Sequence, residues 1–600
     1  MKKLRLFALL LALCFALTAC GAETPAVDTP DDGSQQNQPD QDAGSTVTSD
    51  SDLFTQRDLR TTYDEAKAAV VTLSGTTASS TSNAVSVQGS TVTILDEGTY
   101  ILTGTLTDGQ ILVSAPADAK TQLVLRGASI HSSSSAALYV KTADKVFVTL
   151  EGENTLTGGE SFTAIDENNI DGAVYSKADL TFNGSGSLTV TSPVGHGIVC
   201  KDDLVFTGGQ FTVNSASHGL DVNDSVRFTG AALAIDAGKD GIHVENADDA
   251  ALGLVYIAGG TLKIKAEGDG ISSGYYTQIN GGVFDLLCGG GYENGTKANS
   301  GGYGDFMGGH RLGGGGGGNS STSQTDGTSM KGIKSGSGIL IGGGIFTIDS
   351  ADDAVHAASD VIINGGTWNI ASGDDAVHSD TALTVTAGTF EISQSYEGLE
   401  AEKIYIRGGE FEIHASDDGL NAAGGTDSSG GGGRDEMFGG RPGGGGPGGM
   451  GGMGGNANAC IEVSGGQMKI YSGGDGLDSN GNLRISGGYT YVTNPTSGDV
   501  SVLDSQYTPV ITGGTYIGLG ISSMMAQSFG GESTQGVIAC TCGTQTAGSQ
   551  LIIKDSSGKE VLNLTTEYRT VLLIISTPQI VSGESYDITI GAVSGTLSAE

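Results

Sequence analysis

The segment Val361-Ile-Ile-Asn-Gly-Gly-Thr-Trp-Asn-Ile370, followed by Asp374-Asp-Ala-Val-His378, decides the fold. It contains a short strand, a Gly-Gly pair, a second strand and an acidic turn, and it recurs at a period of roughly 22 residues. Another clear copy is Lys403-Ile-Tyr-Ile-Arg-Gly-Gly-Glu-Phe-Glu-Ile413, which ends in Asp417-Asp-Gly-Leu-Asn421. Repetition at a short fixed period predicts a solenoid, because each unit buries its apolar face only against its neighbours.

Alternation within the repeat predicts which side chains are buried. Leu204, Phe206, Phe211 and Val213 share one face of two consecutive strands, and the equivalent positions of later copies are also apolar. Three strands per repeat, each with an apolar face, predict an all-β chain folded as a three-faced parallel β-helix. A third short strand supplies a further inward column, Ile198, Leu220, Ile242, Ile271, Ile333, Val355, Val377, Leu399, Leu420 and Leu477.

The repeat sets the expected domain boundaries. Residues 53–515 are predicted to form the β-helix, interrupted by two glycine-rich loop insertions at 289–329 and 422–459. Residues 516–600 no longer follow the repeat and are predicted to form a small C-terminal β cap. A cap is expected there because an uncovered final rung would be an unpaired strand edge.

The N-terminal residues indicate export. Residues 1–20 contain basic residues, an apolar run and the ending Leu17-Thr-Ala-Cys20, which resembles a bacterial lipobox. We therefore expect cleavage before Cys20 and a lipid on its sulfur; the alternative is an ordinary signal peptide with an incidental cysteine. Residues 21–52 are rich in Pro, Asp, Ser and Gln and predict a disordered tether. The expected location is the extracellular face of the cell membrane.

The charge of the chain restricts its partners. There are 29 Lys and Arg residues against 68 Asp and Glu residues, a formal net charge of -39. This balance argues against nucleic acid, and against direct binding to an anionic bilayer. It favours cations as partners.

Alignment of the repeats places charged residues in two columns. On adjacent rungs, about 4.8 Å apart, like charges would repel by about 3 kcal/mol per pair at an effective dielectric near 20. The carboxylates are therefore expected either to splay into water or to hold cations between them. The first column reads Asp240, Asp269, Lys331, Asp353, Asp375, Glu397, Asp418 and Asp475, and the second reads His243, Ser272, Lys334, His356, His378, Glu400, Asn421 and Asp478.

Oxygen ligands without thiolates suit Ca²⁺, and calcium is the predicted cofactor. The alternative is that each Asp serves only its own turn by bonding to its own backbone. The histidines of the second column could suggest a transition metal, but their spacing shows no tight cluster. The predicted calcium ligands are Asp352, Asp353, Asp374, Asp375, Glu397, Asp417, Asp418, Asp475 and Asp478.

Two further sets of residues are candidates for function. Lys331 and Lys334 interrupt the acidic column and act either as local neutralising charges or as a base whose pKa is lowered by burial. Trp368 and its equivalents fall in the inward column and are interpreted as core. Tyr256 and Tyr405 alternate outward, and with Tyr396 and Tyr471 they are the candidates for stacking on a sugar ring.

The stretch from Thr91 to Thr157, followed by the Gly-Gly-x-Phe and Asp-Asp-Ala/Gly repeats, resembles the clostridial polysaccharide-binding β-helix family over about residues 55–590. The resemblance implies a right-handed parallel β-helix, bound calcium, an extracellular location and binding of plant cell-wall polysaccharides. The chain is also distantly similar to family 9 polysaccharide lyases, which implies an Asp-rich calcium site and a Lys base. The pairs Asp374/Asp375 and Asp417/Asp418 match the paired-Asp element, whereas Lys331 and Lys334 lie one or more rungs away.

These observations favour a surface-anchored, calcium-dependent protein that binds pectin, polygalacturonate or cellulose. Calcium would join protein carboxylates to uronate carboxylates, which reconciles an acidic protein with an acidic ligand. Two alternatives stay open. One is a pectate-lyase-type enzyme that uses Lys331 or Lys334, and the other is a non-catalytic adhesin or scaffold.

Overall fold

The computed structural model describes residues 53–163, 166–297, 329–423, 456, 458–495, 500–523 and 526–600. The predicted signal segment 1–20 with Cys20, the predicted tether 21–52 and most of the two glycine-rich insertions lie outside the described residues. The chain divides into two compact units, residues 1–55 and residues 56–600. The described part contains no helix that is long and apolar enough to cross a membrane.

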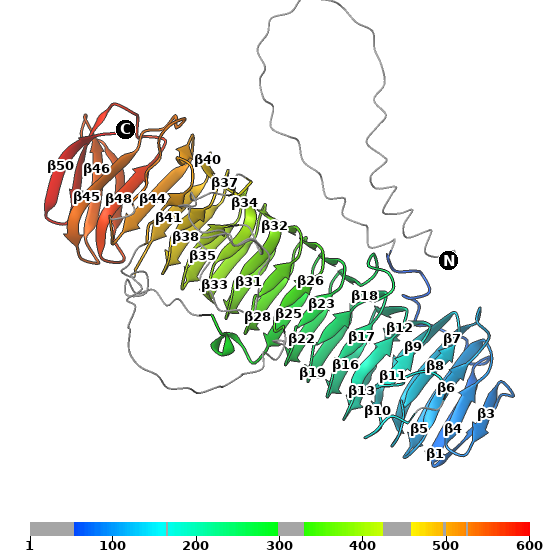
Figure 1. Cartoon of the computed structure of the whole chain (residues 1–600). Helices are drawn as coiled ribbons and strands as arrows, with labels where there is room; N and C mark the ends of the chain where they lie inside the picture. Colours follow the sequence, from blue (N-terminus) through cyan, green and yellow to red (C-terminus); the bar gives the residue numbers. More distant parts are fainter. Residues whose placement is uncertain are drawn as a thin grey trace, which may run out of the picture. The chain divides into compact units, whose positions relative to one another are not determined.

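The second unit is built from parallel strands in three stacks (Figure 1). Along the regular part of the chain, each strand pairs with the third strand after it, so that one rung contributes one strand to each stack. Equivalent residues of successive rungs are about 22 positions apart, as between Asp353 and Asp375. The all-β prediction is confirmed, and the stacks fit a solenoid-like β-helix.

We name the stacks A, B and C in the order in which the chain visits them. Stack A contains β9 (Lys145–Glu151), β12 (Asp179–Gly184), β15 (Asp203–Phe206), β18 (Ser225–Phe228), β21 (Leu254–Ile257), β24 (Thr277–Ile279), β27 (Ile339–Ile341), β30 (Val361–Ile363), β37 (Cys460–Val463), β40 (Asn482–Ile485) and β43 (Val510–Ile511). Stack B contains β10 (Glu153–Thr157), β13 (Ser187–Ser192), β16 (Gln210–Ser215), β19 (Ala232–Ala237), β22 (Thr261–Ala266), β25 (Val283–Cys288), β28 (Ile345–Ser350), β31 (Thr367–Ser372), β33 (Thr389–Ser395), β35 (Glu410–Ala415), β38 (Gln467–Ser472), β41 (Tyr489–Thr493) and β44 (Thr515–Gly520). Stack C contains β6 (Gln110–Ser114), β8 (Leu138–Thr142), β11 (Gly172–Ser176), β14 (His196–Cys200), β17 (Leu220–Val222), β20 (Ile242–Val244), β23 (Ile271–Ser273), β26 (Ile333–Ser335), β29 (Val355–Ala357), β36 (Leu420–Ala422), β39 (Leu477–Ser479) and β42 (Asp504–Ser505).

Four longer strands take part in two stacks each. β32 (Val377–Val385) and β34 (Leu399–Ile406) begin in stack C and end in stack A. β5 (Gly98–Leu106) and β7 (Lys120–His131) run from stack A toward stack B. A short 3₁₀ helix, η1 (Tyr292–Asn294), follows β25.

The interior between the stacks is filled by the predicted apolar columns. The inward column of stack C, from Ile198 to Leu477, is buried throughout. In stack B, aromatic rings of successive rungs lie face to face, with centroids 3.8 Å apart for Phe346 and Trp368 and 4.6 Å apart for Phe390 and Phe411. The interpretation of Trp368 as a core residue is therefore confirmed. This continuous stacking makes the rungs depend on one another for burial.

The Gly-Gly corners allow the aromatic ladder to form. Gly366 and Gly388 have φ angles of 107° and 127°, a region that other residues rarely adopt. A Cβ at Gly366 would also lie 2.8 Å from Trp368 Nε1, and one at Gly388 would lie 2.9 Å from Phe390. Glycine is therefore required by both backbone conformation and packing at these two corners, Gly365-Gly366 and Ala387-Gly388.

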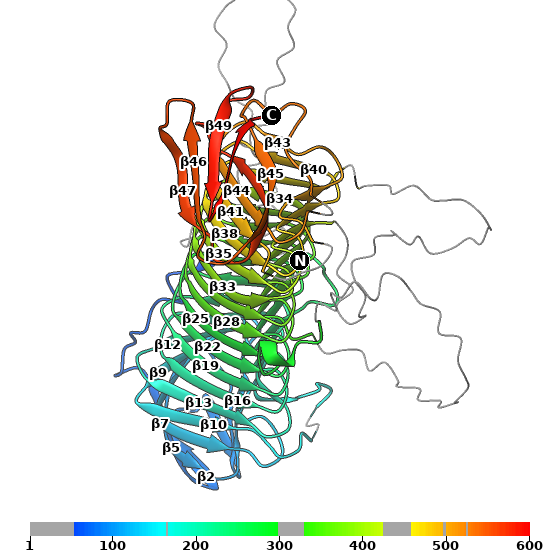
Figure 2. The same ribbon diagram turned by 90° about the vertical axis from the view of Figure 1, so that its left-hand side faces the viewer.

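Antiparallel strands close both ends of the stack. At the N-terminal end, β1 (Ala69–Gly75) pairs with β2 (Thr77–Ser80), and β3 (Val85–Gln88) pairs with β4 (Thr91–Ile94). At the other end, β48 (Thr570–Ser576) pairs antiparallel with β44 and with β45 (Ile538–Gln545). A four-stranded sheet completes this end (Figure 2), with β46 (Gln550–Asp555), β47 (Glu560–Thr565), β49 (Ser585–Ile590) and β50 (Val593–Ser598).

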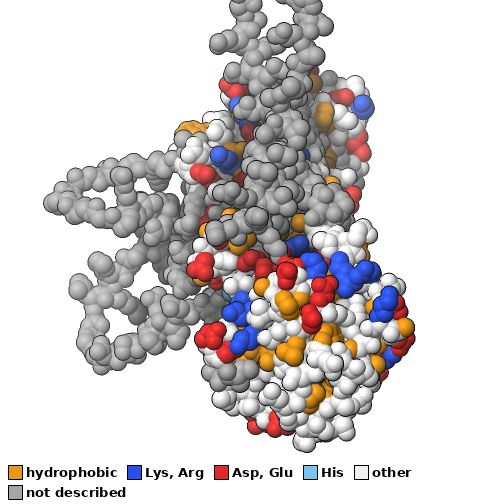
Figure 3. All heavy atoms as spheres, turned by 90° about the vertical axis from the view of Figure 1, so that its right-hand side faces the viewer, with side chains coloured by type: hydrophobic (Ala, Val, Ile, Leu, Met, Phe, Trp, Pro, Cys, Tyr) orange, Lys and Arg blue, Asp and Glu red, His pale blue; other side chains and the backbone are white. Residues whose placement is uncertain are grey.

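The surface of the N-terminal end mixes charges of both signs. Figure 3 views this end and shows Lys and Arg side chains next to Asp and Glu side chains. One network joins Arg126 Nε to Glu151 Oε2 at 2.6 Å and Arg126 Nη1 to Glu65 Oε1 at 2.7 Å. Nearby, the buried carboxylate of Asp58 pairs with Lys145 Nζ at 2.8 Å. The segment before β1 is thereby fixed to the outer side of stack A.

Candidate functional site

A polar stripe of two columns follows stack C. The first column lies two residues before the inward apolar residue of each rung, and the second lies one residue after it. The structure adds His196, His218 and Asp504 to the alignment made from the sequence, in which Asp221 lies one rung before His243. The first column is His196, His218, Asp240, Asp269, Lys331, Asp353, Asp375, Glu397, Asp418 and Asp475, and the second is Asp221, His243, Ser272, Lys334, His356, His378, Glu400, Asn421, Asp478 and Asp504.

The carboxylates of the first column bond to the backbone of the next rung. Asp240 Oδ1 accepts the backbone N–H of Asp269 at 2.8 Å. Asp353 Oδ1 accepts the N–H of Asp375 at 3.1 Å, and Asp375 Oδ1 accepts the N–H of Glu397 at 3.2 Å. Each acid thus satisfies a backbone donor between rungs, which differs from the expected turn contact of an Asp with its own backbone.

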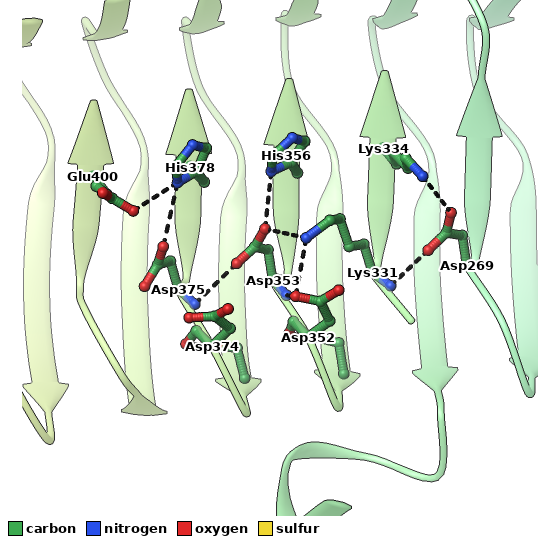
Figure 4. Close-up of polar contacts among 12 residues, drawn as sticks. Asp269, Lys331, Lys334, Asp352, Asp353, His356, Asp374, Asp375, His378 and Glu400 are labelled. Carbon is green, nitrogen blue, oxygen red and sulfur yellow. Dashed lines mark hydrogen bonds and ion pairs between the residues drawn. The ribbon is translucent and has the colours of Figure 1, made fainter. Parts of the chain in front are cut away.

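The second oxygen of these carboxylates faces the second column (Figure 4). Asp240 Oδ2 lies 3.0 Å from His243 Nδ1, and Asp353 Oδ2 lies 2.9 Å from His356 Nδ1. On these two rungs, an imidazole of the second column therefore forms a hydrogen bond with a carboxylate of the first column. These contacts reduce the repulsion expected from stacked carboxylates.

His378 is the most enclosed imidazole of the stripe. Its Nδ1 lies 3.3 Å from Asp375 Oδ2 and 2.7 Å from Glu400 Oε2, and its Nε2 lies 3.2 Å from Asp380 Oδ1. Although burial alone would lower the pKa of His378, hydrogen bonds to these three carboxylates raise it well above the usual value. The imidazolium acts as a fixed positive charge within the stripe.

Lys331 is a buried neutralising charge. Its Nζ lies 2.9 Å from Asp352 Oδ1 and 2.5 Å from Asp353 Oδ2 (Figure 4). Although burial alone would lower the pKa of Lys331, the two adjacent carboxylates raise it above the usual value. The hypothesis of a base with a lowered pKa is therefore wrong for Lys331. Lys334 is half-exposed, and its Nζ lies 3.5 Å from Asp269 Oδ2.

Asp352, Asp353 and Asp374 lie together, as the calcium hypothesis requires, but lysines already occupy the space between them. Ligand oxygens of the three side chains lie within 4.8 Å of one another. Lys331 binds the first two carboxylates, and Lys297 Nζ lies 2.6 Å from Asp374 Oδ1. This set does not fit a divalent ion, because ammonium groups already hold the oxygens that a metal would take.

Glu397 also has a partner within the protein. Its Oε1 accepts a hydrogen bond from Asn421 Nδ2 at 2.9 Å. Asp375 is shared between a backbone N–H and His378. The expected role of Glu397 and Asp375 as calcium ligands is therefore not favoured by their contacts, which are those of the inter-rung ladder.

The C-terminal end of the stripe is different, because acids follow acids there. Asp475, Asp478 and Asp504 present carboxylate oxygens within 4.8 Å of one another. Within the described residues, no Lys, Arg or His side chain forms an ion pair with Asp418, Asp475 or Asp504. Burial and neighbouring carboxylates raise the pKa of Asp475 to about 8, and they raise that of Asp418 as well.

A small residue leaves space between the acids at this end. A Cβ at Gly474 would lie 2.3 Å from Oδ1 of both Asp417 and Asp418. The two carboxylates therefore converge on the same point above the backbone. A hard cation, which takes six to eight oxygen ligands, fits this donor set.

Two of the four tyrosines predicted to bind sugar are buried. Tyr256 is only 1% exposed, and its hydroxyl accepts a hydrogen bond from Asn280 Nδ2 at 2.9 Å. Tyr471 is 7% exposed, stacks on His414 at 4.5 Å and donates a hydrogen bond to Glu567 at 2.7 Å. The prediction is wrong for these two, since Tyr471 packs against Glu567 and Tyr568 and Tyr256 is buried beside Asn280.

The other two predicted tyrosines are partly exposed. Tyr396 lies close to the stripe, with Lys297 Nζ 5.4 Å from the centre of its ring. Tyr405 lies on stack A, with the Arg407 guanidinium 5.9 Å from its ring. Both rings keep surface that a sugar could contact.

Residues at both ends of the stripe are absent from the alignment made from the sequence, although the sequence carries a signal for them. Gly195-His-Gly-Ile198 and Ser217-His-Gly-Leu220 carry His where Lys239-Asp-Gly-Ile242 carries Asp. Leu503-Asp504-Ser505 matches Leu477-Asp478-Ser479. If only acidic residues are aligned, the first two segments are left out and the first column begins at Asp240.

Comparison with known proteins identifies the family. A model described as carbohydrate-binding domain-containing protein matches residues 88–376. A carbohydrate-binding domain-containing protein of Acetivibrio thermocellus is 44% identical over 210 residues, which cover 34% of this chain and 73% of that protein. The chain belongs to this family.

A solved structure is also similar to the carbohydrate-binding domain-containing chain. It is the gadolinium derivative of a polysaccharide lyase-like protein from C. thermocellum, with 36% sequence identity. The match covers 37% of this chain and 92% of that chain, with a TM-score of 0.36.

Proposed function

We propose that this protein is a calcium-dependent polysaccharide-binding protein anchored at the cell surface. Membership of the carbohydrate-binding domain-containing family supports the polysaccharide as partner. The observation that carries the calcium dependence is the acidic end of the polar stripe, where carboxylate oxygens of Asp475, Asp478 and Asp504 converge. Within the described residues, neither Asp475 nor Asp504 forms an ion pair with a Lys, Arg or His side chain.

Calcium would be held by the acids at this end. Asp418 and Asp475 are adjacent members of the first column, and Asp478 and Asp504 are adjacent members of the second. Together with Asp417, they form a set of carboxylates on three successive rungs. Bound Ca²⁺ would supply a positive charge that binds uronate carboxylates, and the protein residues would fix its position.

The proposed ligands are plant cell-wall glycans, with polygalacturonate and pectin favoured over cellulose. An acidic chain with a formal net charge of -39 needs a cation to bind an acidic glycan. Tyr396 and Tyr405 are the remaining candidates for stacking on sugar rings. The equal spacing of rungs would let one extended polymer meet equivalent positions along the coil.

Two details of this proposal come from the N-terminal sequence and from general chain geometry. We propose that Cys20 is lipidated and that the protein is held at the extracellular face of the membrane. Replacement of Cys20 by Ser would then release the protein from the membrane fraction. We also propose a right-handed coil, the hand of nearly all parallel strand crossovers.

We do not propose Lys331 as the base of a lyase, because its contacts keep its ammonium charged and enclosed. The binding function is tested by the retention of the protein on insoluble glycans. Full-length protein is incubated with insoluble pectin and with cellulose, in calcium and in chelator, beside the Asp475→Asn variant. Retention that needs calcium and is lost in the variant supports the proposal. Equal retention in chelator contradicts it.

A further inference from the structure

Three side chains at the N-terminal end of the stripe converge on a single point. His218 Nδ1 lies 3.3 Å from Asp240 Oδ2 and accepts the backbone N–H of Asp240 at 3.2 Å. His243 Nδ1 lies 3.0 Å from the same carboxylate oxygen. The three ligand atoms all lie within 4.8 Å of one another. A tetrahedral Zn²⁺ with bonds of about 2.1 Å holds its ligand atoms about 3.4 Å apart. The two measured spacings match the edges of such a site.

The second coordination shell of this cluster favours a metal ligand. His243 Nε2 lies 3.4 Å from Glu245 Oε2, on the far side of the ring from Asp240. A carboxylate on this side favours the tautomer with its proton on Nε2, in which the Nδ1 lone pair points toward Asp240 and is available to a metal. This carboxylate–imidazole arrangement is the usual support of a zinc-bound histidine.

The rung geometry explains why the two imidazoles come so close. His218 belongs to the first column and His243 to the second column of the next rung, yet their rings stack with centroids 4.5 Å apart. Asp240, in the first column beside His243, reaches both rings. A cation between the three groups would replace the proton between Asp240 and His243, and it would take the His218 Nδ1 lone pair in place of the Asp240 N–H.

The cluster is accessible, which sets it apart from the other His-containing group. The side chains of His218, Asp240 and His243 are 14%, 14% and 24% exposed. His378, which lies with Asp375 and Glu400, is only 1% exposed and is enclosed by three carboxylates. An ion from solvent can therefore reach the first group.

We propose that His218, Asp240 and His243 form a second metal site, selective for a transition ion of the Zn²⁺ class, with its fourth position open to water or to a ligand oxygen. Two imidazoles and one carboxylate suit Zn²⁺, Cu²⁺ or Ni²⁺, whereas the all-oxygen set around Asp475 suits Ca²⁺. The two sites lie at opposite ends of the stripe and differ in ligand chemistry.

The test uses the full-length chain stripped of metal and titrated with Co²⁺ and Zn²⁺. Co²⁺ reports the geometry through the strong visible absorption of tetrahedral coordination, and Zn²⁺ affinity is measured by competition with a chromophoric chelator. Replacement of His243 by Ala is expected to weaken Zn²⁺ binding by about 100-fold, and Glu245→Gln by about 10-fold. His356→Ala is the matched control, because it removes an imidazole of the same stripe outside this site.

The outcomes are distinct. A tetrahedral Co²⁺ spectrum that is lost in His218→Ala and His243→Ala, but kept in His356→Ala, supports the site. An octahedral spectrum, or Zn²⁺ affinity equal in all variants, overturns it. Far-ultraviolet circular dichroism of each variant in chelator shows that the strand content is intact. Calcium binding and glycan retention are expected to be unchanged in His243→Ala, so this result is independent of the proposed function.

Discussion

Lys331 Nζ lies 2.5 Å from Asp353 Oδ2, and both side chains are buried. This pair marks the rung where the first column changes from acid to base. It explains why the Asp352, Asp353 and Asp374 group, which is among the calcium ligands predicted from the repeat, is already neutralised by the protein. It also moves the candidate calcium site toward Asp475.

Lys331 is predicted to be essential for stability. Lys331→Met leaves Asp352 and Asp353 without their ammonium partner, and removal of one member of a buried ion pair costs about 3–5 kcal/mol. Urea denaturation followed by circular dichroism measures this loss. Lys334→Met is the control, because its half-exposed ion pair is worth about 1 kcal/mol or less. Equal losses in both variants would refute the assignment.

The pH dependence of stability in chelator should carry the signature of Asp475. Burial raises the pKa of this carboxyl to about 8, whereas an unfolded Asp titrates near pH 3.9, about 4 pH units lower. The folded chain therefore binds this proton more tightly, so its contribution to stability is complete below about pH 4 and is lost as the pH rises toward 8. Thermal melting between pH 4 and 9 measures the decline, and Asp475→Asn is expected to reduce it. A variant that melts with the wild-type pH profile would show that Asp475 is not the titrating group.

The aromatic ladder of stack B should respond strongly to truncation. Trp368→Ala removes a fully buried ring between Phe346 and Phe390 and is expected to cost about 3–5 kcal/mol in the free energy of unfolding. Thr367→Ala, one residue away on the exposed side of the same strand, is expected to change stability by about 0.5 kcal/mol or less. Chemical denaturation of both variants checks the difference. A small effect at Trp368 would mean that the rungs do not depend on this stack.

Glycan affinity should depend on the exposed tyrosines and not on the buried ones. Tyr405→Ala and Tyr396→Ala are each expected to weaken binding of polygalacturonate about 10-fold, the value of one aromatic stacking contact. Tyr256→Phe, which loses only the hydroxyl bonded to Asn280, is expected to bind as the wild type does. Affinity electrophoresis in gels containing polygalacturonate makes the comparison. If both alanine variants show the same mobility shift as the wild type, the glycan binds at another part of the protein.

The sequence predicted the fold well because the repeated pattern of apolar residues and glycines determines where the strands and corners of the backbone lie. Period-two alternation around Phe346, Trp368 and Phe390 identified the inward face, and the buried stack confirms it. Positive φ at Gly366 follows from the same pattern, since the corner recurs in every copy. These features depend only on neighbours in the repeat, and a single alignment reveals them.

The candidate site was less predictable because its charges depend on contacts between rungs. The sequence placed Lys331 in the acidic column but could not show that its ammonium reaches Asp352 and Asp353. The side chains of Tyr256 and Tyr471 lie on the outward side of their strands, but both rings are buried by other parts of the chain. Which outward position is covered depends on how distant segments pack, and the repeat does not encode that packing.

The most direct test of the central claim is calcium titration by isothermal calorimetry on the full-length chain. We predict saturable Ca²⁺ binding that is lost in Asp475→Asn and Asp504→Asn and retained in Asp352→Asn, because Lys331 engages Asp352. Binding that is lost in Asp352→Asn but unaffected by Asp475→Asn and Asp504→Asn would contradict the account.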